Sequence, residues 1–334
     1  MIRPIPVIIG PTAVGKTDLS LEIARHLEAE IVSGDCRQIY RRLDIGTAKP
    51  SLAQRQTVPH HLIDLLHPDE PLNAARFARL AWSCIQTIEA RRKLPLVVGG
   101  SGLYIRALTD GLFAGPGANP RLRLALEAEA HSLGLQVLHD RLAAVDPAAA
   151  SRIHRHDRVR IIRALEIYTL TGRPISHWQC QWQNPVRPRP FVLIGLTRDR
   201  DDLRRRIAAR TEAMLQMGLV AEVRRVLALG YPSTLPTLQS VGYGEIVAYL
   251  DGQWDLAHAR ERIERHTWRL AKRQLTWFRH VTGIHWITLT GTPDCAAIQL
   301  IQDVLANTLE PLPEPSPTRW QEEQGTACTC PPSM

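Results

Sequence analysis

The sequence has few of the features that mark membrane-bound, secreted or metal-binding proteins. No apolar run approaches the ~18 residues that a membrane span requires, so we expect no membrane association. The six cysteines are scattered, without the density of a disulfide framework or the spacing of a zinc site, which indicates a reducing, cytoplasmic setting. We interpret the C-x-C pair Cys328 and Cys330 as incidental rather than as a soft-metal site. Residues 1–10, MIRPIPVIIG, are expected to form a first strand and not a secretory signal.

Acidic residues are outnumbered by basic ones, which favours a polyanionic partner. The chain of 334 residues has 41 Lys and Arg against 33 Asp and Glu, a formal net charge of +8. Residues 152–163, RIHRHDRVRIIR, contain five arginines and two histidines. Residues 258–280 carry seven Lys and Arg against two Glu, interleaved with tryptophan and phenylalanine. Both segments can also be solvated helix faces above an apolar stripe, so charge alone does not identify RNA as the partner.

The sequence GPTAVGKT at residues 10–17 has the spacing of a P-loop. It follows a short apolar run, residues 7–9, and precedes a segment with helical periodicity, residues 18–27. In that context the two glycines allow backbone N–H groups to converge on a phosphate, the lysine supplies a mobile charge, and Thr17 can ligate Mg²⁺. The predicted phosphate cradle comprises Gly10, Pro11, Thr12, Ala13, Val14, Gly15, Lys16 and Thr17.

Strand and helix signals alternate in the first hundred residues, as in a parallel sheet flanked by helices. A helical segment without strand signals, residues 121–172, then interrupts this pattern between two breaker-rich stretches at 111–120 and 181–190. Strand patterns return at 191–196 and 285–289. We therefore predict an α/β fold with a P-loop NTPase-like parallel sheet and an inserted all-helical domain. The expected parts are a first part of the core (1–115), the insertion (116–187), a second part of the core (188–310) and a disordered tail (311–334).

The sequence lacks the acid with which ATP-hydrolysing P-loop proteins usually end an apolar strand. Residues 96–102, LVVGGSG, end in glycines instead. The nearest carboxylate is Asp35, after the expected strand at 31–33. It can organise Mg²⁺, accept a proton from a nucleophile, or simply cap a turn. Ser101, in the glycine-rich turn, can reach the same site or belong to a plain strand-to-helix turn.

Seven motifs, spread in order over residues ~5 to 290, resemble the tRNA dimethylallyltransferase family. The resemblance implies transfer of a dimethylallyl group from dimethylallyl diphosphate to the N6 amine of adenosine 37, next to the anticodon, with Mg²⁺ as cofactor. It also implies a helical insertion that binds the anticodon stem-loop, and we expect a monomer. The motifs are GPTAVGKT (10–17), SGDCRQIYRRLDIGTAKP (33–50), VPHHLID (58–64), VVGGSGLYIRAL (97–108), RALEIY (163–168), SVGYGE (240–245) and AKRQLTWFR (271–279).

The same resemblance implies roles for individual residues. Asp35 is the base that engages the adenine amine, Lys16 and Arg210 neutralise the diphosphate, and Thr12 lines the substrate site. Arg210 lies in an arginine-rich segment, where most charges simply face water. The expected tRNA-contacting positions are Asp35, Cys36, Arg37, Gln38, Ser101, Arg123, Val159, Arg160, Ile161, Ile162, Arg163, Gln239, Ser240, Val241, Gly242, Tyr243 and Gly244.

Two positions depart from the family pattern. Cys36 stands where relatives usually have serine, and Gly244 where many have arginine. The first can perturb a hydrogen bond beside Asp35, and the second weakens the expectation that this segment holds a phosphate. Three alternatives stay open: a prenyltransferase with a mononucleotide acceptor, for which the helical insertion and the basic segments would be superfluous; a small-molecule kinase; and an RNA-binding nucleotide switch without transfer chemistry.

Overall fold

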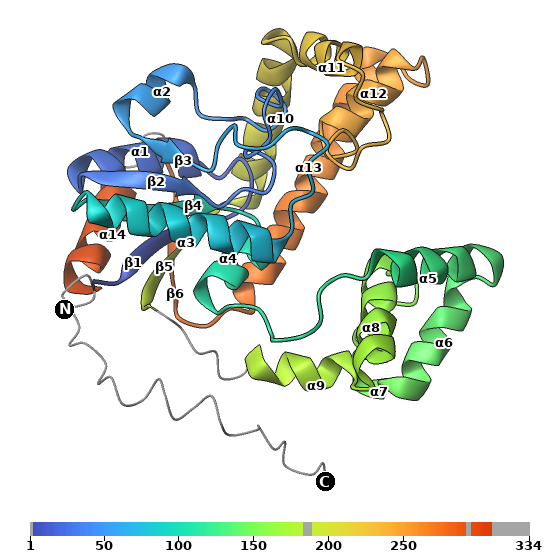
Figure 1. The fold of residues 1–334 in the computed structure, drawn as a ribbon. Coiled ribbons are helices and arrows are strands. Elements are labelled where there is room, and N and C mark those ends of the chain that lie inside the picture. The colour runs from blue at the N-terminus through green and yellow to red at the C-terminus, as the bar shows by residue number, and fades with distance from the viewer. Residues whose placement is uncertain (1–2, 183–188, 292–294, 309–334) are drawn as a thin grey trace, which may run out of the picture. The chain divides into compact units, whose positions relative to one another are not determined.

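The computed structural model describes residues 3–182, 189–291 and 295–308 (Figure 1). The chain divides into two compact units: one formed by Met1–Thr109 with Pro188–Met334, and one formed by Asp110–Arg187. The boundary at residues 109 and 110 lies six residues before the predicted one. The predicted tail and its two cysteines fall outside the described residues, and no described helix is both long and apolar enough to span a bilayer.

The larger unit contains a single six-stranded sheet, and every pair of neighbouring strands in it is parallel. The strand order is β3-β2-β4-β1-β5-β6, so β1 is flanked by β4 and β5. This confirms the predicted fold class. The strands are β1 (Ile5–Ile9), β2 (Ala29–Ser33), β3 (His60–His61), β4 (Leu94–Gly99), β5 (Phe191–Arg198) and β6 (Ile284–Leu289).

Helices cover both faces of this sheet because its strands are apolar on both sides. α1 and α14 pack on one face, where Ile8, Ile31 and Ile194 meet Ile23 and Ile301. α3 and α4 pack on the other face, and α11, α12 and α13 extend the same core. The helices of this unit are α1 (Lys16–His26), α2 (Leu52–Thr57), α3 (Ala74–Ala90), α4 (Gly102–Thr109), α10 (Arg200–Gln216), α11 (Leu219–Ala228), α12 (Tyr243–Leu250), α13 (Leu256–Arg279) and α14 (Cys295–Thr308).

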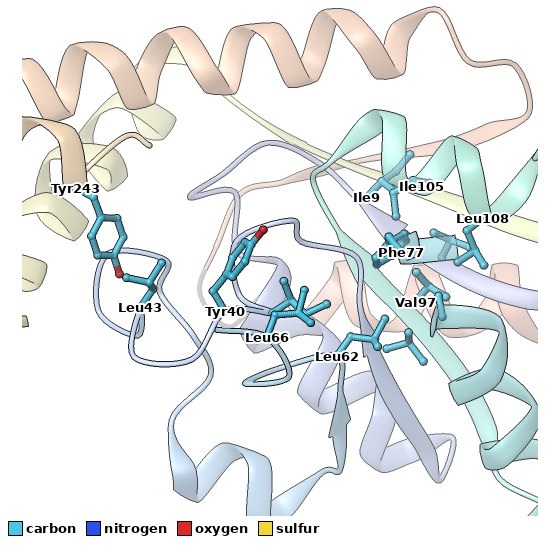
Figure 2. Close-up of a cluster of buried hydrophobic side chains, with 14 of the residues drawn as sticks. Ile9, Tyr40, Leu43, Leu62, Leu66, Phe77, Val97, Ile105, Leu108 and Tyr243 are labelled. Atoms are coloured by element: carbon cyan, nitrogen blue, oxygen red, sulfur yellow. The ribbon is translucent and has the colours of Figure 1, made fainter. Parts of the chain in front are cut away.

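The second of these cores joins segments that are far apart in the sequence (Figure 2). Phe77 of α3 and Val97 of β4 are fully buried where this helix packs on the sheet. Leu43, in the loop after β2, and Tyr243, the first residue of α12, are fully buried in the same cluster. The loop that follows β2 is therefore anchored by apolar packing, although it has little regular secondary structure.

The smaller unit is entirely helical and has its own apolar core. Leu126, Leu138, Leu142, Ile161 and Leu165 are buried together in it. No strand occurs among its described residues, as the sequence predicts for 121–172. Its helices are α5 (Pro120–Ser132), α6 (Leu135–Val145), α7 (Pro147–Ala150), α8 (Arg158–Thr171), α9 (Ile175–Gln179) and the short 3₁₀ helix η1 (Cys180–Trp182).

Candidate active site

The loop between β1 and α1 is shaped to hold an anion. Gly15, just before α1, has a φ of 110°, which glycine adopts without strain. Gly10 lies so close to β5 that a Cβ atom would come within 2.8 Å of the Leu196 carbonyl oxygen. α1 begins at Lys16, so the free N–H groups of its first turn and the helix dipole both favour negative charge at the loop.

Lys16 is folded back onto this loop. Its Nζ donates hydrogen bonds to the carbonyl oxygens of Gly10, at 3.0 Å, and Pro11, at 2.7 Å. The pKa of Lys16 is lowered to about 8, mainly because burial disfavours the charged form; Asp35 opposes this shift, and Arg210 adds to it. An anion in the loop would stabilise the ammonium form.

Three arginines from the segment around α10 surround the same loop. Arg198 donates to the Val14 carbonyl at 2.7 Å, and Arg206 donates to the Ala13 carbonyl at 3.0 Å. Arg210 reaches the inner side, where its Nη1 donates to the Thr12 hydroxyl at 3.0 Å. Burial lowers the pKa of Arg210, and the charge of Asp35 opposes that shift. Arg210 thus lies at the cavity, where the family resemblance predicted it, and not on a solvent-facing surface of α10.

A cavity of about 190 Å³ brings the predicted catalytic groups together. Its walls come from the loop after β1, the turn after β2 and helices α10 and α13, all in the larger unit. Lys16 and Arg210 line it together with the carboxylate of Asp35, so two cations and a potential base face one space. The lining residues are Thr12, Ala13, Gly15, Lys16, Thr17, Asp18, Asp35, Gln38, Thr47, Ala48, Arg206, Arg210 and Gln274.

Asp35 lies in the turn after β2, which is hydrogen-bonded to the turn after β4. Its Oδ1 accepts a hydrogen bond from the Arg37 N–H at 2.8 Å, which caps the turn after β2. The Cys36 N–H donates to Ser101 Oγ at 3.1 Å, so the glycine-rich turn after β4 fixes the segment that carries the acid. Gly99 permits this approach, because a Cβ atom there would lie 2.3 Å from the Gly34 carbonyl oxygen. Burial, with a smaller effect of Asp35, raises the pKa of the Cys36 thiol.

The turn after β2 is tied in turn to the loop at residues 44–48. Gln38 accepts from the Ser33 hydroxyl at 3.0 Å and donates to the carbonyls of Thr47, at 3.4 Å, and Ala48, at 3.2 Å. Thr47 and Ala48 line the cavity. Gln38 therefore connects two of the cavity walls, and its amide is already engaged on both sides.

Glu222 of α11 holds this loop from the side of the core. Its buried carboxylate accepts hydrogen bonds from the N–H groups of Asp44, Ile45 and Gly46, at 3.0, 2.8 and 3.2 Å. The hydroxyl of Tyr243 donates to the same carboxylate at 2.6 Å. A Cβ atom on Gly46 would lie 2.4 Å from the Tyr243 ring, so the motifs at 33–50 and 240–245 fit together at this point.

The donors for a metal ion in the cavity are oxygen atoms. Thr17, Asp18 and Asp35 line it, and among the described residues no group of three or more His, Cys, Asp or Glu side chains could hold a metal by itself. Mg²⁺ typically takes one or two protein ligands and completes its shell with phosphate oxygens and water. The residues present therefore fit an ion that is held jointly with a diphosphate, and Thr17 remains the predicted protein ligand.

The tRNA-contacting positions predicted in the larger unit differ in accessibility. The turn from Asp35 to Gln38 is half-buried, as is Ser101, and of these residues Asp35 and Gln38 line the cavity. Gln239 is exposed, whereas Gly242 and Tyr243 are buried and Ser240, Val241 and Gly244 lie between these extremes. A Cβ atom on Gly244 would make only an ordinary contact, at 3.4 Å from the Gln239 carbonyl oxygen, so packing does not impose the glycine there.

In the smaller unit, the predicted positions separate into buried and exposed ones. Val159 and Arg160 of α8 are exposed, whereas Ile161 and Ile162 belong to the core of this unit. Arg123 and Arg163 both bind the buried carboxylate of Glu166, at 2.9 and 2.5 Å. Arg163 also donates to the carbonyls of residues 116 and 117. The two arginines that bind Glu166 thus hold the unit together, and Arg160 presents its charge to solvent.

The fold and the cavity define an α/β P-loop protein that places a carboxylate beside its anion-binding loop. The IPP transferase family model matches residues 38–281, and the Isopentenyl transferase model matches residues 4–67. The chain therefore belongs to the IPP transferase family.

Similar proteins carry corresponding names. A tRNA dimethylallyltransferase from Geobacter metallireducens is 48% identical over 86% of this chain and 93% of its own length. One from Heliobacterium modesticaldum is 46% identical over 91% and 95%. The crystal structure of the Bacillus halodurans tRNA isopentenylpyrophosphate transferase matches with a TM-score of 0.68 and 39% identity, covering 92% and 97% of the two chains. A eukaryotic dimethylallyltransferase acting on tRNA matches with a TM-score of 0.74 and 25% identity, covering 97% and 84%.

Proposed function

We propose that this protein transfers a dimethylallyl group from dimethylallyl diphosphate to the N6 amine of adenosine 37 in tRNA, releasing diphosphate. The observation that carries the proposal is the cavity in which Lys16, Arg210 and the P-loop face Asp35. The family membership of the chain supports it. The enzyme acts as a cytoplasmic monomer.

The P-loop stabilises a leaving group in this reaction. As the bond between the allylic carbon and the diphosphate oxygen breaks, its electron pair stays on the diphosphate. The amides of the loop, Lys16 and Arg210 neutralise that charge in a site where they are already oriented. No water has to be activated, which agrees with the glycines, rather than an acid, that end β4.

Asp35 receives the proton of the acceptor. The N6 amine forms a bond to the allylic carbon and loses one proton, which the carboxylate takes up as a general base. Thr17 would contribute a protein ligand to Mg²⁺, and the ion would supply positive charge that stabilises the departing diphosphate. The target adenosine must leave its stack to reach the cavity, which costs least in an unpaired anticodon loop.

Product analysis tests the function directly. The purified protein is incubated with dimethylallyl diphosphate, Mg²⁺ and unmodified tRNA, and the digested nucleosides are analysed by mass spectrometry. We expect N6-(dimethylallyl)adenosine among the nucleosides, and no product when AMP replaces tRNA. A product from AMP would favour the mononucleotide acceptor. Transfer of the terminal phosphate of ATP, without use of the prenyl donor, would contradict the proposal and favour a kinase.

Diphosphate binding is expected to weaken above about pH 8. Lys16 loses its proton as the pH rises through its lowered pKa of about 8, and a neutral amine no longer attracts a diphosphate. The affinity for inorganic pyrophosphate should therefore be greatest below this pKa and decline above it. A Lys16→Arg variant, titrated over the same range, should lack this decline because guanidinium stays charged. Equal profiles for the two proteins would contradict the role of Lys16.

The exposed Arg160 is expected to contribute to the salt dependence of tRNA binding. Its side chain is 65% exposed and only loosely paired with Asp157, at 3.3 Å. Arg160→Gln should lower the slope of log Kd against log salt by about one, because one phosphate contact and its released counterion are lost. Arg224→Gln, at an exposed position of α11, is the matched control. An unchanged slope for Arg160→Gln would mean that Arg160 is only a solvated surface residue of α8 and does not contact a tRNA phosphate.

A further inference from the structure

Gln274 of α13 joins the P-loop to the glycine-rich turn after β4. Its side-chain Oε1 accepts a hydrogen bond from the Thr12 N–H at 2.9 Å. Its Nε2 donates to the Gly100 carbonyl at 3.0 Å. The two partners lie 262 and 174 residues away in sequence, and Gln274 itself lines the cavity. A single amide thus connects the P-loop to the turn after β4.

The packing of α13 fixes this amide in place. A Cβ atom on Gly100 would lie 2.6 Å from Gln274 Nε2, and one on Gly102 would lie 2.3 Å from the Trp277 ring. Trp277 is one turn beyond Gln274 on the same helix. The glycines after β4 therefore allow α13 to approach this turn. The approach brings the neutral amide of Gln274 to the end of β4, where many P-loop proteins carry an acid.

The bridge determines what Thr12 offers to a ligand. The Thr12 N–H is used by Gln274, so it is not available to an anion. The Thr12 hydroxyl accepts a hydrogen bond from Arg210, which leaves its own hydrogen to be donated into the cavity. Backbone and side chain of Thr12 are each fixed by one partner, and both partners face the diphosphate site.

We propose that Gln274 is a positioning residue for the diphosphate of the prenyl donor, acting through Thr12. Its amide supplies one acceptor for the Thr12 N–H and one donor for the Gly100 carbonyl, which no carboxylate can do at neutral pH. It also keeps this side of the site free of negative charge next to the leaving group. The role in prenyl transfer rests on the proposed function, whereas the role in holding a diphosphate does not.

Inorganic pyrophosphate with Mg²⁺ is the probe, and three variants separate the contributions. Gln274→Met keeps the length and removes both hydrogen bonds, and we expect its pyrophosphate Kd to rise about tenfold. Gln274→Glu keeps the shape but replaces the donor with charge, and we expect a rise of about a hundredfold. Gln216→Ala, at an exposed position of α10, is the control and should bind as the wild type does.

Two further readouts distinguish positioning from general structural damage. The KM for dimethylallyl diphosphate should rise in parallel with the pyrophosphate Kd, while the KM for tRNA stays within about twofold of the wild-type value. Lowering the pH should restore pyrophosphate binding by Gln274→Glu relative to the wild type, because the protonated carboxyl regains a donor.

Unchanged pyrophosphate binding in both folded variants would overturn the proposal, as would an equal rise in both KM values. If either Gln274→Met or Gln274→Glu does not fold, pyrophosphate binding by the other variant tests the proposal. A wild-type protein that binds pyrophosphate in this way but transfers no prenyl group would instead overturn the proposed function and leave the role of Gln274 in holding a diphosphate intact.

Discussion

Asp35→Asn is expected to lower the rate of prenyl transfer by about 10²–10⁴-fold while leaving tRNA binding unchanged, because the amide cannot accept the proton of the N6 amine. The substitution preserves an oxygen for the Arg37 N–H, so the turn after β2 should keep its shape. Single-turnover rates with saturating donor and tRNA measure the chemical step directly. Asp69→Asn, at an exposed position, is the matched control and should retain the wild-type rate.

This experiment separates two roles of Asp35 that the structure combines. The carboxylate caps its own turn, and it also lines the cavity beside Lys16 and Arg210. If Asp35→Asn retained full activity, capping would be its only role and another group would have to accept the proton. A large loss in Asp35→Asn with normal thermal stability would assign the loss to chemistry rather than to folding.

Glu222→Gln is expected to destabilise the larger unit by about 3 kcal/mol or more. Four donors converge on this buried carboxylate, three of them backbone N–H groups of residues 44–46. Glutamine turns one of the two oxygens into a donor, so buried N–H groups lose their acceptor at about 1–3 kcal/mol each. Urea denaturation gives the change in the free energy of unfolding.

The neighbours of Glu222 provide graded comparisons. Tyr243→Phe removes only one of the four donors and should cost about 1 kcal/mol. Glu261→Gln, at an exposed position of α13, should change stability by less than about 0.5 kcal/mol. If Glu222→Gln were as stable as Glu261→Gln, the loop at residues 44–48 would be held by apolar packing alone.

Local patterns were sufficient to predict the strand, loop and helix at residues 5–26 and most of the sheet. Local patterns indicate the P-loop, the all-helical segment and five strands, namely β1, β2, β4, β5 and β6. β3 has only two residues, His60 and His61, which is too short for any periodicity. Its place at the edge of the sheet depends on pairing with β2, and nothing within the strand itself indicates that partner.

The site was less predictable wherever a residue acts through partners that are distant in the sequence. Gln274 lies within the motif at 271–279, and Glu222 lies outside all seven motifs. The hydrogen-bond partners of both residues appear only when α13 and α11 are packed against loops from the first hundred residues. Arg163 illustrates the opposite case. It lies in a strongly basic run, yet its charge is paired with Glu166 inside the helical unit. Composition predicts charge, but only the fold determines which charges remain free.

The contact between Gly46 and the Tyr243 ring restricts how the family can vary. The Cβ atom of alanine at position 46 would collide with the Tyr243 ring. A smaller side chain at position 243 would remove the hydroxyl group that donates a hydrogen bond to Glu222. A residue larger than glycine at position 46 therefore requires a smaller side chain at position 243. We expect homologous sequences to substitute these two positions jointly, so that their covariation would identify the contact without any structure.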